Sequence, residues 1–415
     1  MHIDTGDTAF VLLSAALVML MTPGLGFFYG GMVQGKNVIN TLMLSFLTIA
    51  IVGVQWVLLG YSLAFGPAHG PLGAFLGGLD WAGLRGVGLL PHADYSATIP
   101  HVAFVAFQAT FAIITPALIS GAIVERMNLK SYFLFVLLWS TLVYAPIAHW
   151  VWGVGGWLRT MGVLDFAGGA VVHVSSGVSA LVAAAVLGPR QQDRLGHSIP
   201  FVLLGAALLW FGWFGFNAGS ALGANGIAAL AFLTTSVAAS AGALGWMGID
   251  LFRRGQITAL GAASGAVAGL VAITPAAGFV SPRSAIALGL LSAAACYVAV
   301  RVTRKGLKID DSLDAFSVHG VGGFVGALLT GVFASKALNP AGFDGLIHGN
   351  PMQVLTQLLG LAAVIAYAAI GSFAILKLLD RVVGLRVPEH VENDGLDRHQ
   401  HGERAYGTGF LTPQR

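Results

Sequence analysis

The chain has 415 residues, of which 56% are hydrophobic and only 9% are charged. Soluble domains carry about 25% charged residues, so this composition excludes an ordinary soluble protein and indicates one that crosses a bilayer many times. The formal net charge of +3 comes from basic residues that are scattered singly through the predicted loops, which argues against a nucleic-acid partner. The single Cys296 excludes a disulfide within one chain.

The first apolar run is preceded by "MHIDTGDTAF", which contains Asp4 and Asp7 but no Lys or Arg. A cleavable signal peptide begins with a positively charged region, and this stretch has none. We therefore expect these residues to belong to the first membrane span rather than to a leader.

Apolar windows of about 20 residues mark the helices that cross a bilayer, and eleven such windows predict an all-α membrane protein. Because five is odd, spans one to five and six to ten would form two halves of opposite orientation, an inverted repeat followed by one extra C-terminal helix. We expect a membrane domain over residues 1–380 and a tail over 381–415. The windows lie at residues 10–32, 41–65, 101–125, 132–153, 168–188, 200–220, 226–250, 258–277, 284–303, 315–335 and 352–380.

The distribution of Lys and Arg predicts the orientation of these spans. The odd-numbered loops hold eleven basic residues and the even-numbered loops hold four. By the positive-inside rule the odd-numbered loops and the tail are cytoplasmic, and the N-terminus is outside. An odd number of spans also places the N-terminus and the tail on opposite sides of the membrane, which agrees with this orientation. The eleven residues are Lys36, Arg126, Lys130, Arg190, Arg194, Arg253, Arg254, Arg301, Arg304, Lys305 and Lys308.

Two longer segments lie outside the predicted spans. The longest outer loop, about 66–100, is rich in Gly and Pro and is either the wall of an external mouth or a passive cover. The tail after about residue 381 is polar and mixed in charge, which is typical of a solvated and partly disordered end.

A histidine lies inside the fifth predicted span, where "FAGGAVVHVSSGVSAL" carries His173. An ionisable residue at bilayer depth is costly and is usually kept for function. The tenth span is the counterpart of the fifth in the predicted repeat, and its "FSVHGVGGFVGALL" carries His319. Each histidine has an aspartate upstream, Asp165 and Asp314 respectively. The pattern predicts a pair of facing histidines.

Other interpretations of these residues are open. One buried histidine is often an ordinary core residue, but two at matched positions favour a working pair. Two neutral rings can share one hydrogen and present their remaining nitrogens to a conducted molecule. A metal site would need a third ligand, which the neighbouring spans do not supply, so we expect neither a metal nor a cofactor. Asp165 could simply be the N-cap of the fifth span.

At these residues the chain resembles the ammonium transporter branch of the Amt/Rh family, and the resemblance runs in order from the first span to the tail. The segment between Trp152 and Asp165 is one residue longer than the family pattern, and the outer loop before His101 is divergent. The motifs that carry the resemblance are "FYGGMVQGKNV" (28–38), "FQATFAIITPALISGAIVER" (107–126), "YAPIAHWVWG" (144–153), "DFAGGAVVHVSSG" (165–177), "WFGFNAGSA" (213–221) and "VGLRVPE" (383–389) with "GLD" and "HGE" beyond it.

The resemblance implies an outer ammonium recruitment site formed by Trp152, Phe111 and Ser220. It implies that Phe111 and Phe216 stack to close the outer mouth of a pore. Ammonium would lose its proton there, and ammonia would pass inward, with or without transfer of the proton. The chain would be a transporter rather than an enzyme.

Within the implied pore, His173 and His319 are the twin histidines and Asp165 supports the site. Members of the family are homotrimers in the cell membrane, with one pore in each subunit among membrane lipid. Their cytoplasmic tail packs on a neighbouring subunit. A PII-type signalling protein blocks many bacterial members from inside, so we expect a prokaryotic plasma or inner membrane and such a partner.

Three other functions are open at this point. An ammonium sensor would use its tail for signalling more than its pore for flux. A gas channel of Rh type is disfavoured by Trp152, which Rh proteins usually lack. A membrane-embedded metalloenzyme would need the third ligand that the sequence does not offer.

Overall fold

The computed structural model describes residues 2–192 and 196–406, and within these residues the regular secondary structure is helical and contains no β-strand. The all-α prediction is confirmed. The α-helices are α1 Thr5–Met32, α2 Val38–Gln55, α3 Tyr61–Phe65, α4 His101–Ile119, α5 Leu129–Trp139, α6 Ala145–Trp152, α7 Trp157–Met161, α8 Ser175–Leu187, α9 Ile199–Gly219, α10 Gly226–Arg254, α11 Ala259–Ile273, α12 Pro282–Arg301, α13 Val321–Phe333, α14 Met352–Val382 and α15 Glu389–Asp394.

Short helical turns of other pitch extend or join these helices. The wider turns are π-helical, and each of the first five continues into or out of an α-helix. The π-helical turns are η1 Trp56–Gly60, η5 Ser140–Tyr144, η6 Gly169–Val174, η7 Val302–Gly306, η8 Phe316–Gly320 and η10 Asp397–His401. The 3₁₀ turns are η2 Gly70–Leu72, η3 Ala82–Leu84, η4 Ser120–Ala122 and η9 Leu346–His348.

Ten helices in the described part of the chain are long and apolar enough to cross a membrane, and they coincide with ten of the eleven predicted spans. The protein is therefore a multi-pass membrane protein. The eighth predicted span, 258–277, is the shorter helix α11 of 15 residues. Such a helix rises about 22 Å, less than the ~30 Å hydrocarbon core. It ends at Ile273, two residues before Pro275, which has no backbone N–H to continue the helical hydrogen bonds.

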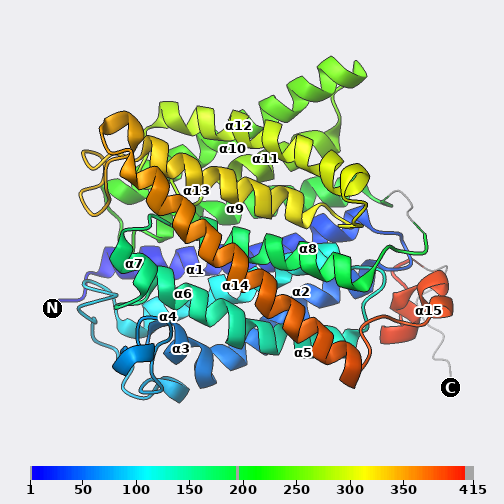
Figure 1. Ribbon diagram of the computed structural model, residues 1–415, viewed down its shortest axis with the longest axis horizontal. Coiled ribbons are helices and arrows are strands. Elements are labelled where there is room, and N and C mark those ends of the chain that lie inside the picture. Colours follow the sequence, from blue (N-terminus) through cyan, green and yellow to red (C-terminus); the bar gives the residue numbers. More distant parts are fainter. Residues whose placement is uncertain (1, 193–195, 407–415) are drawn as a thin grey trace.

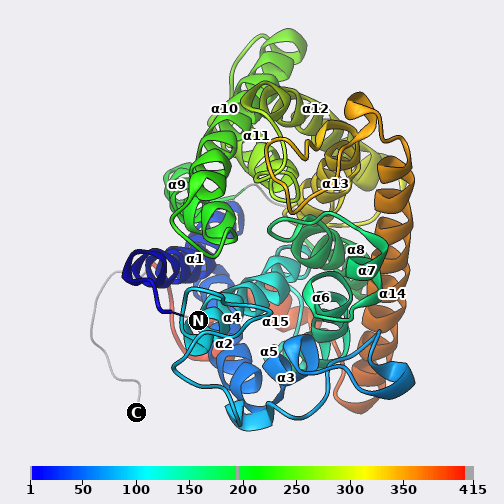
Figure 2. The same ribbon diagram turned by 90° about the vertical axis from the view of Figure 1, so that its left-hand side faces the viewer.

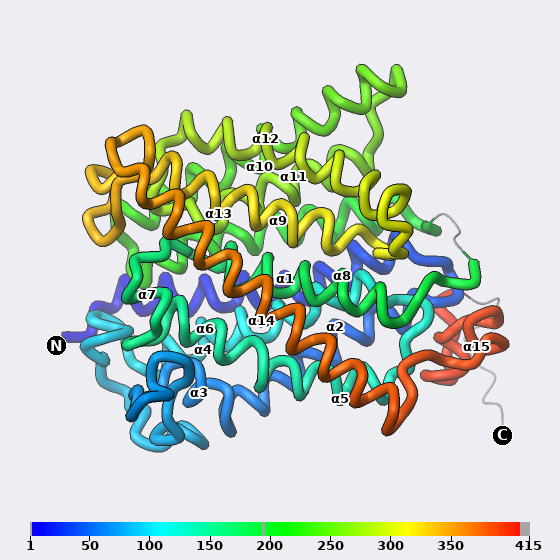
Figure 3. The backbone as a smooth tube through the Cα atoms, in the orientation of Figure 1, coloured from blue at the N-terminus to red at the C-terminus, as the bar shows by residue number. Residues whose placement is uncertain are grey.

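The long helices run roughly lengthwise in one bundle, with the N-terminus at one end and the last described residues at the other (Figure 1). Viewed along its length, α9 to α13 lie on one side and α2 to α6 on the other, and α14 lies along the outside (Figure 2). The long helix α14 runs obliquely across the bundle (Figure 3) and packs on both α8 and α13. The turn before each of these two helices contacts the other half: η6 contacts α13, and η8 contacts α8.

The loops predicted to be cytoplasmic meet at the end of the bundle that holds the C-terminal tail. Lys36 Nζ donates a hydrogen bond to Asn393 O, and the Val387 N–H donates to Arg126 O at 3.0 Å. The guanidinium of Arg386 binds the carboxylate of Glu392 at 2.8 Å. The predicted grouping of the odd-numbered loops thus agrees with the fold.

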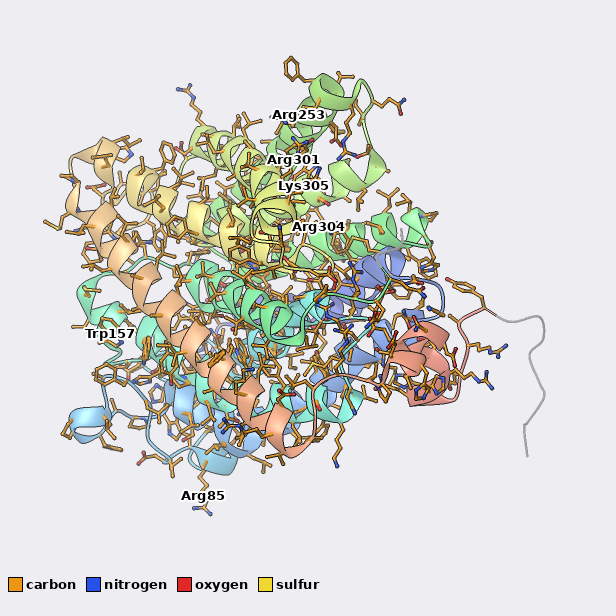
Figure 4. All side chains as sticks on the ribbon, turned by 45° about the vertical axis from the view of Figure 1, so that its right-hand side comes forward. Arg85, Trp157, Arg253, Arg301, Arg304 and Lys305 are labelled. Carbon is orange, nitrogen blue, oxygen red and sulfur yellow. The ribbon has the colours of Figure 1, made fainter. Side chains whose placement is uncertain are left out.

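Basic residues of two further odd-numbered loops gather nearby, at the ends of α10 and α12. Arg253 lies 5.9 Å from the centroid of the Tyr297 ring, so the two helix ends touch. Arg253, Arg301, Arg304 and Lys305 lie close to one another in Figure 4. Arg194, which entered the charge count, lies outside the described residues.

The tail departs from the prediction of a solvated end. Leu396 is fully buried, and Asp397 accepts hydrogen bonds from the backbone N–H groups of Ile39 and Asn40 at 3.1 and 2.8 Å. The carboxylate therefore caps the first turn of α2, whose backbone donors would otherwise lack partners. The prediction is wrong for this part of the tail because a mixed-charge composition does not reveal specific capping contacts. Residues 407–415 lie outside the described part.

Candidate functional site

Both histidines singled out in the sequence lie on π-helical turns. His173 is in η6, which leads into α8, and His319 is in η8, which leads into α13. A π-helical turn widens the helix locally and is frequent at functional sites. The two turns touch in the interior, so residues far apart in the sequence share one site.

Asp165 fixes the start of η6. Its carboxylate accepts four backbone hydrogen bonds, from residues 168 to 171, at 2.5 to 3.0 Å. The capping interpretation of Asp165 is confirmed by these contacts. Gly168 has a φ of +114°, a left-handed conformation that glycine adopts without strain and that turns the chain toward the carboxylate. Burial raises the pKa of Asp165, while the four N–H donors act in the opposite direction.

The corresponding aspartate in the second half is Asp311, not Asp314. Asp311 accepts from the Ala315 and Phe316 N–H groups at 3.0 and 2.8 Å and so caps η8. Asp314 instead pairs with Arg304 at 2.9 Å. The sequence interpretation missed Asp311, although a signal existed. Asp165 and Asp311 each stand eight residues before their histidine.

The two histidine rings face each other in the interior. Nδ1 of His173 and Nδ1 of His319 are 3.3 Å apart, the ring centroids are 5.3 Å apart, and the planes differ by 20°. The rings are 1% and 3% exposed, respectively. One shared hydrogen between the Nδ1 atoms leaves Nε2 of each ring for another partner. The predicted pairing of His173 and His319 is thus present in the fold.

Glycines allow this close approach. A Cβ atom on Gly177 of α8 would collide with the backbone of Gly320, directly after His319. A Cβ atom on Gly323 would lie 2.9 Å from Cβ of His173. Small residues at helix crossings permit backbones to approach closely in membrane proteins. Glycine at these positions brings both histidine-bearing turns together.

Aromatic rings also lie close to His173. Trp213 stacks on it with centroids 5.3 Å apart, and Phe216 lies 6.0 Å away. Phe216 in turn contacts Phe111 at a centroid distance of 4.3 Å. Nε2 of His173 is buried and has no hydrogen-bond partner among the residues that the structure describes. This nitrogen is available to a molecule that enters between the rings.

A cavity of about 210 Å³ lies outside the two phenylalanines, at the end of the bundle that holds the N-terminus. Trp152, Phe111 and Ser220 all line it. The rings of Trp152 and Phe111 are perpendicular, with centroids 6.0 Å apart. Trp152 Nε1 donates to Asp165 O at 2.9 Å, which orients the indole. The Ser220 hydroxyl donates to Phe216 O at 2.8 Å, so the lone pairs of its oxygen are free to accept.

A larger cavity of about 630 Å³ lies on the opposite side of the histidine pair and reaches His319. Charged groups surround it, including Arg190, which binds Glu125 and Asp310 at 2.9 Å each. Burial alone would raise the pKa of Asp310, but the Arg190 guanidinium outweighs it and lowers that pKa overall. The sequence interpretation did not identify this charge cluster, because its members are far apart in the chain.

The site residues named from the sequence therefore form one line through the protein. The smaller cavity, which we call the outer cavity, leads to Phe111 and Phe216. The two histidines follow, and the larger cavity, which we call the inner cavity, opens beyond them. The residues on it are Trp152, Phe111, Ser220, Phe216, His173 and His319, with Asp165 capping η6 beside it.

Over residues 9–406 the chain matches the protein family described as Ammonium Transporter Family. It is 51% identical over 403 residues to a protein of Bacillus subtilis (strain 168) named ammonium transporter, and the match covers 97% of this chain and 98% of that protein. The crystal structure of Mep2 from Saccharomyces cerevisiae is similar, with a TM-score of 0.87 and 38% identity over 94% of this chain and 88% of Mep2. A structure titled "Sensor Amt Protein" is also similar, with a TM-score of 0.87 and 30% identity over 95% of this chain and 98% of that one.

Proposed function

The chain belongs to the ammonium transporter family and transports ammonium, and from this premise we propose that it binds NH₄⁺ in the outer cavity, removes its proton and conducts NH₃ past the twin histidines. The observation that carries the proposal is the enclosed histidine pair between the two cavities. The relatives are named as transporters, and we propose no enzymatic activity and no cofactor for this chain. Its similarity to the sensor protein is lower in identity and gives a sensing function no better support.

The outer cavity suits the capture of a small cation. A cation over the faces of Trp152 and Phe111 gains about 0.5–2 kcal/mol. The Ser220 oxygen adds an acceptor that an N–H of ammonium can use and that K⁺ cannot use in this way. These contacts are strong enough to concentrate ammonium at the mouth and weak enough to release it.

Onward passage of the intact ion is opposed by its desolvation. Moving a small cation from water into a dry interior carries an idealised cost on the order of 20 kcal/mol. Ammonium is a weak acid comparable to a lysine side chain, so its deprotonation at neutral pH costs on the order of 3–5 kcal/mol. Loss of the proton near Phe111 and Phe216 therefore has the lower free-energy cost. K⁺ has no proton to lose, so selectivity follows from chemistry rather than from pore diameter.

Ammonia between the rings would replace part of its lost hydration by hydrogen bonds to the imidazole nitrogens. The unpartnered Nε2 of His173 supports this role. The Nδ1–Nδ1 contact of 3.3 Å also offers a route for the released proton. If the proton follows that route, net charge crosses the membrane, and if it returns to the outer side, transport is electroneutral.

We further propose eleven spans, with α11 as the eighth, arranged as an inverted repeat of five plus five. The capped turns η6 and η8 at matched positions support the repeat, and the first and last described residues, at opposite ends of the bundle, support an odd number of spans (Figure 1). The basic end of the bundle then faces the cytoplasm of a prokaryotic cell, and the N-terminus faces outward.

The assembly is part of the same proposal. Both cavities and both histidines come from one chain, which supports one pore in each subunit of a homotrimer embedded in lipid. The charged inner end, with the tail packed on it, is the surface on which a PII-type protein would dock. We keep the division into a membrane domain, 1–380, and a cytoplasmic tail, 381–415.

Two tryptophan variants test the outer binding step. The protein is reconstituted in liposomes that contain a pH dye, and interior alkalinisation is followed after pulses of increasing ammonium. Trp152→Leu is expected to raise the half-saturating concentration about fivefold, the loss of roughly 1 kcal/mol of cation attraction. Trp157→Leu is the matched control, because Trp157 packs on Trp150 and does not line the cavity. Equal effects of the two variants, or neither alkalinisation nor an ammonium-dependent current with the unmodified protein, would contradict the proposal.

A further inference from the structure

The outer cavity contains a polar side chain that the proposed transport pathway does not use. Gln108 lies on α4 between Phe104 and Phe111, and the spacing of four and three residues puts all three on one face of the helix. All three line the outer cavity, together with Trp152 and Ser220. Gln108 is one turn before Phe111 in α4, on the outer side of the pair of phenylalanines.

The amide of Gln108 is incompletely satisfied. Its side-chain oxygen, Oε1, is buried and has no hydrogen-bond partner among the described residues. A buried acceptor without a donor is unfavourable, and native proteins rarely retain one without a reason. The oxygen and nitrogen of the amide are nearly equal in size, so half a turn about the terminal bond exchanges them and can turn the oxygen to the cavity.

We propose that Oε1 of Gln108 accepts a hydrogen bond from ammonium in the outer cavity and sets its preference for ammonium over alkylated ammonium. The inference rests on the proposed recruitment site at Trp152, Phe111 and Ser220. Gln108 is a specificity-determining residue there, and it takes no part in the later loss of the proton.

The geometry of the substrate explains why another acceptor matters. Ammonium has four N–H groups that point to the corners of a tetrahedron. In the cavity Ser220 offers one oxygen, while the rings of Trp152 and Phe111 attract any cation, K⁺ included. A second directed acceptor from Gln108 engages another N–H group. Hydrogen bonds to a charged group are about twice as strong as neutral ones, so one amide acceptor is enough to alter selectivity.

Two substitutions separate this role from simple packing. Gln108→Leu removes the acceptor, and Gln108→Met removes it while keeping an unbranched side chain of similar length, in case the leucine variant does not fold. Gln55→Leu is the matched control. Gln55 also ends in a buried oxygen without a partner in the described part of the chain, but it is at the end of α2 and does not line the outer cavity.

The experiment measures interior alkalinisation of liposomes against ammonium concentration, with and without K⁺ or methylammonium as competitor. Both Gln108 variants are expected to raise the half-saturating ammonium concentration about tenfold and to keep the maximal rate within about twofold. Methylammonium should then compete about as well as ammonium itself. Gln55→Leu should match the unmodified protein.

The outcomes distinguish this inference from the function on which it rests. If Trp152→Leu raises the half-saturating concentration and both Gln108 variants leave it unchanged, Gln108 only packs, and the recruitment site stands without it. If Trp152→Leu also has no effect, the recruitment site itself is refuted and the inference falls with it. A Gln108 variant that lowers the maximal rate with unchanged half-saturation would likewise overturn the proposed role.

Discussion

The segment that carries His173 and the segment that carries His319 begin alike. Each is a π-helical turn whose first N–H groups are capped by an aspartate eight residues before the histidine. Asp165 accepts four backbone hydrogen bonds, and Asp311 accepts two from the same kind of donor. The local architecture is repeated, so any functional difference must come from the surroundings.

Those surroundings differ sharply. The rings of Trp213 and His319 each lie 5.3 Å from the His173 ring, centroid to centroid, and the Phe216 ring lies 6.0 Å away. His319 reaches the inner cavity of about 630 Å³, which is lined by charged side chains. Water from that cavity can take over hydrogen bonds at His319, whereas nothing comparable is at hand for His173. We therefore expect the enclosed segment around His173 to select the conducted molecule, and the segment around His319, which opens to the inner cavity, to release it.

The largest expected effect comes from removing the caps. Asp165→Ala leaves four buried N–H groups without an acceptor and should lower the free energy of unfolding by about 4 kcal/mol. Asp311→Ala should lower it by about 1–2 kcal/mol. Denaturant unfolding of the purified proteins in detergent, followed by tryptophan fluorescence, measures both. Equal decreases in the free energy of unfolding would show that the two caps are energetically equivalent and would contradict the proposed difference between the two segments.

A smaller effect is expected from pH at the second cap. Burial raises the pKa of Asp311 to about 6, although its backbone donors oppose this shift. The folded protein then binds this proton more tightly than the unfolded chain, so the contribution of Asp311 to stability falls as the pH rises from about 4 to above 6. Relative to Asp311→Asn, the unmodified protein should lose up to about 3 kcal/mol across that range.

This prediction is checked by the unfolding free energies of the two proteins at intervals of pH. The carboxylate is fully buried, so screening by solvent does not diminish the expected change. Parallel curves for the unmodified protein and the Asp311→Asn variant would contradict the assignment of the raised pKa to this residue.

The smallest difference concerns the histidines themselves. His173→Ala should reduce ammonium transport about a hundredfold, as the loss of a preorganised hydrogen-bonding group does in enzyme sites. His319→Ala should reduce it about tenfold, because water from the inner cavity substitutes in part. Liposome alkalinisation rates give both values, with the exposed His348→Ala as control. A larger loss at His319 would reverse our assignment of the selective half.

Hydropathy alone was sufficient for most of the fold, because a span needs only length and apolar composition. The eighth span was overestimated because a hydropathy window does not register Pro275, which has no backbone N–H to continue α11 beyond this point. The tail was mistaken for a solvated end, since one carboxylate that caps α2 from 357 residues away leaves no local pattern.

The candidate site was predictable where a motif repeats. His173 and His319 were paired from the repeat, and the fold brings them into contact. Asp311 was missed because three aspartates, Asp310, Asp311 and Asp314, crowd before His319, and only the spacing of eight residues distinguishes the one that caps. The cluster of Arg190 with Glu125 and Asp310 depends on long-range packing and leaves no signal in the local sequence.

The central claim is that ammonium crosses the enclosed segment without its proton. Currents on a solid-supported membrane, recorded with interior pH after matched ammonium and K⁺ pulses, test it most directly, with His173→Ala alongside. For the unmodified protein we predict interior alkalinisation or a current after the ammonium pulse, and neither after the K⁺ pulse. In His173→Ala we predict that this response is lost or no longer distinguishes ammonium from K⁺. A K⁺ current as large as the ammonium current in the unmodified protein would mean that intact cations pass, and it would contradict the account.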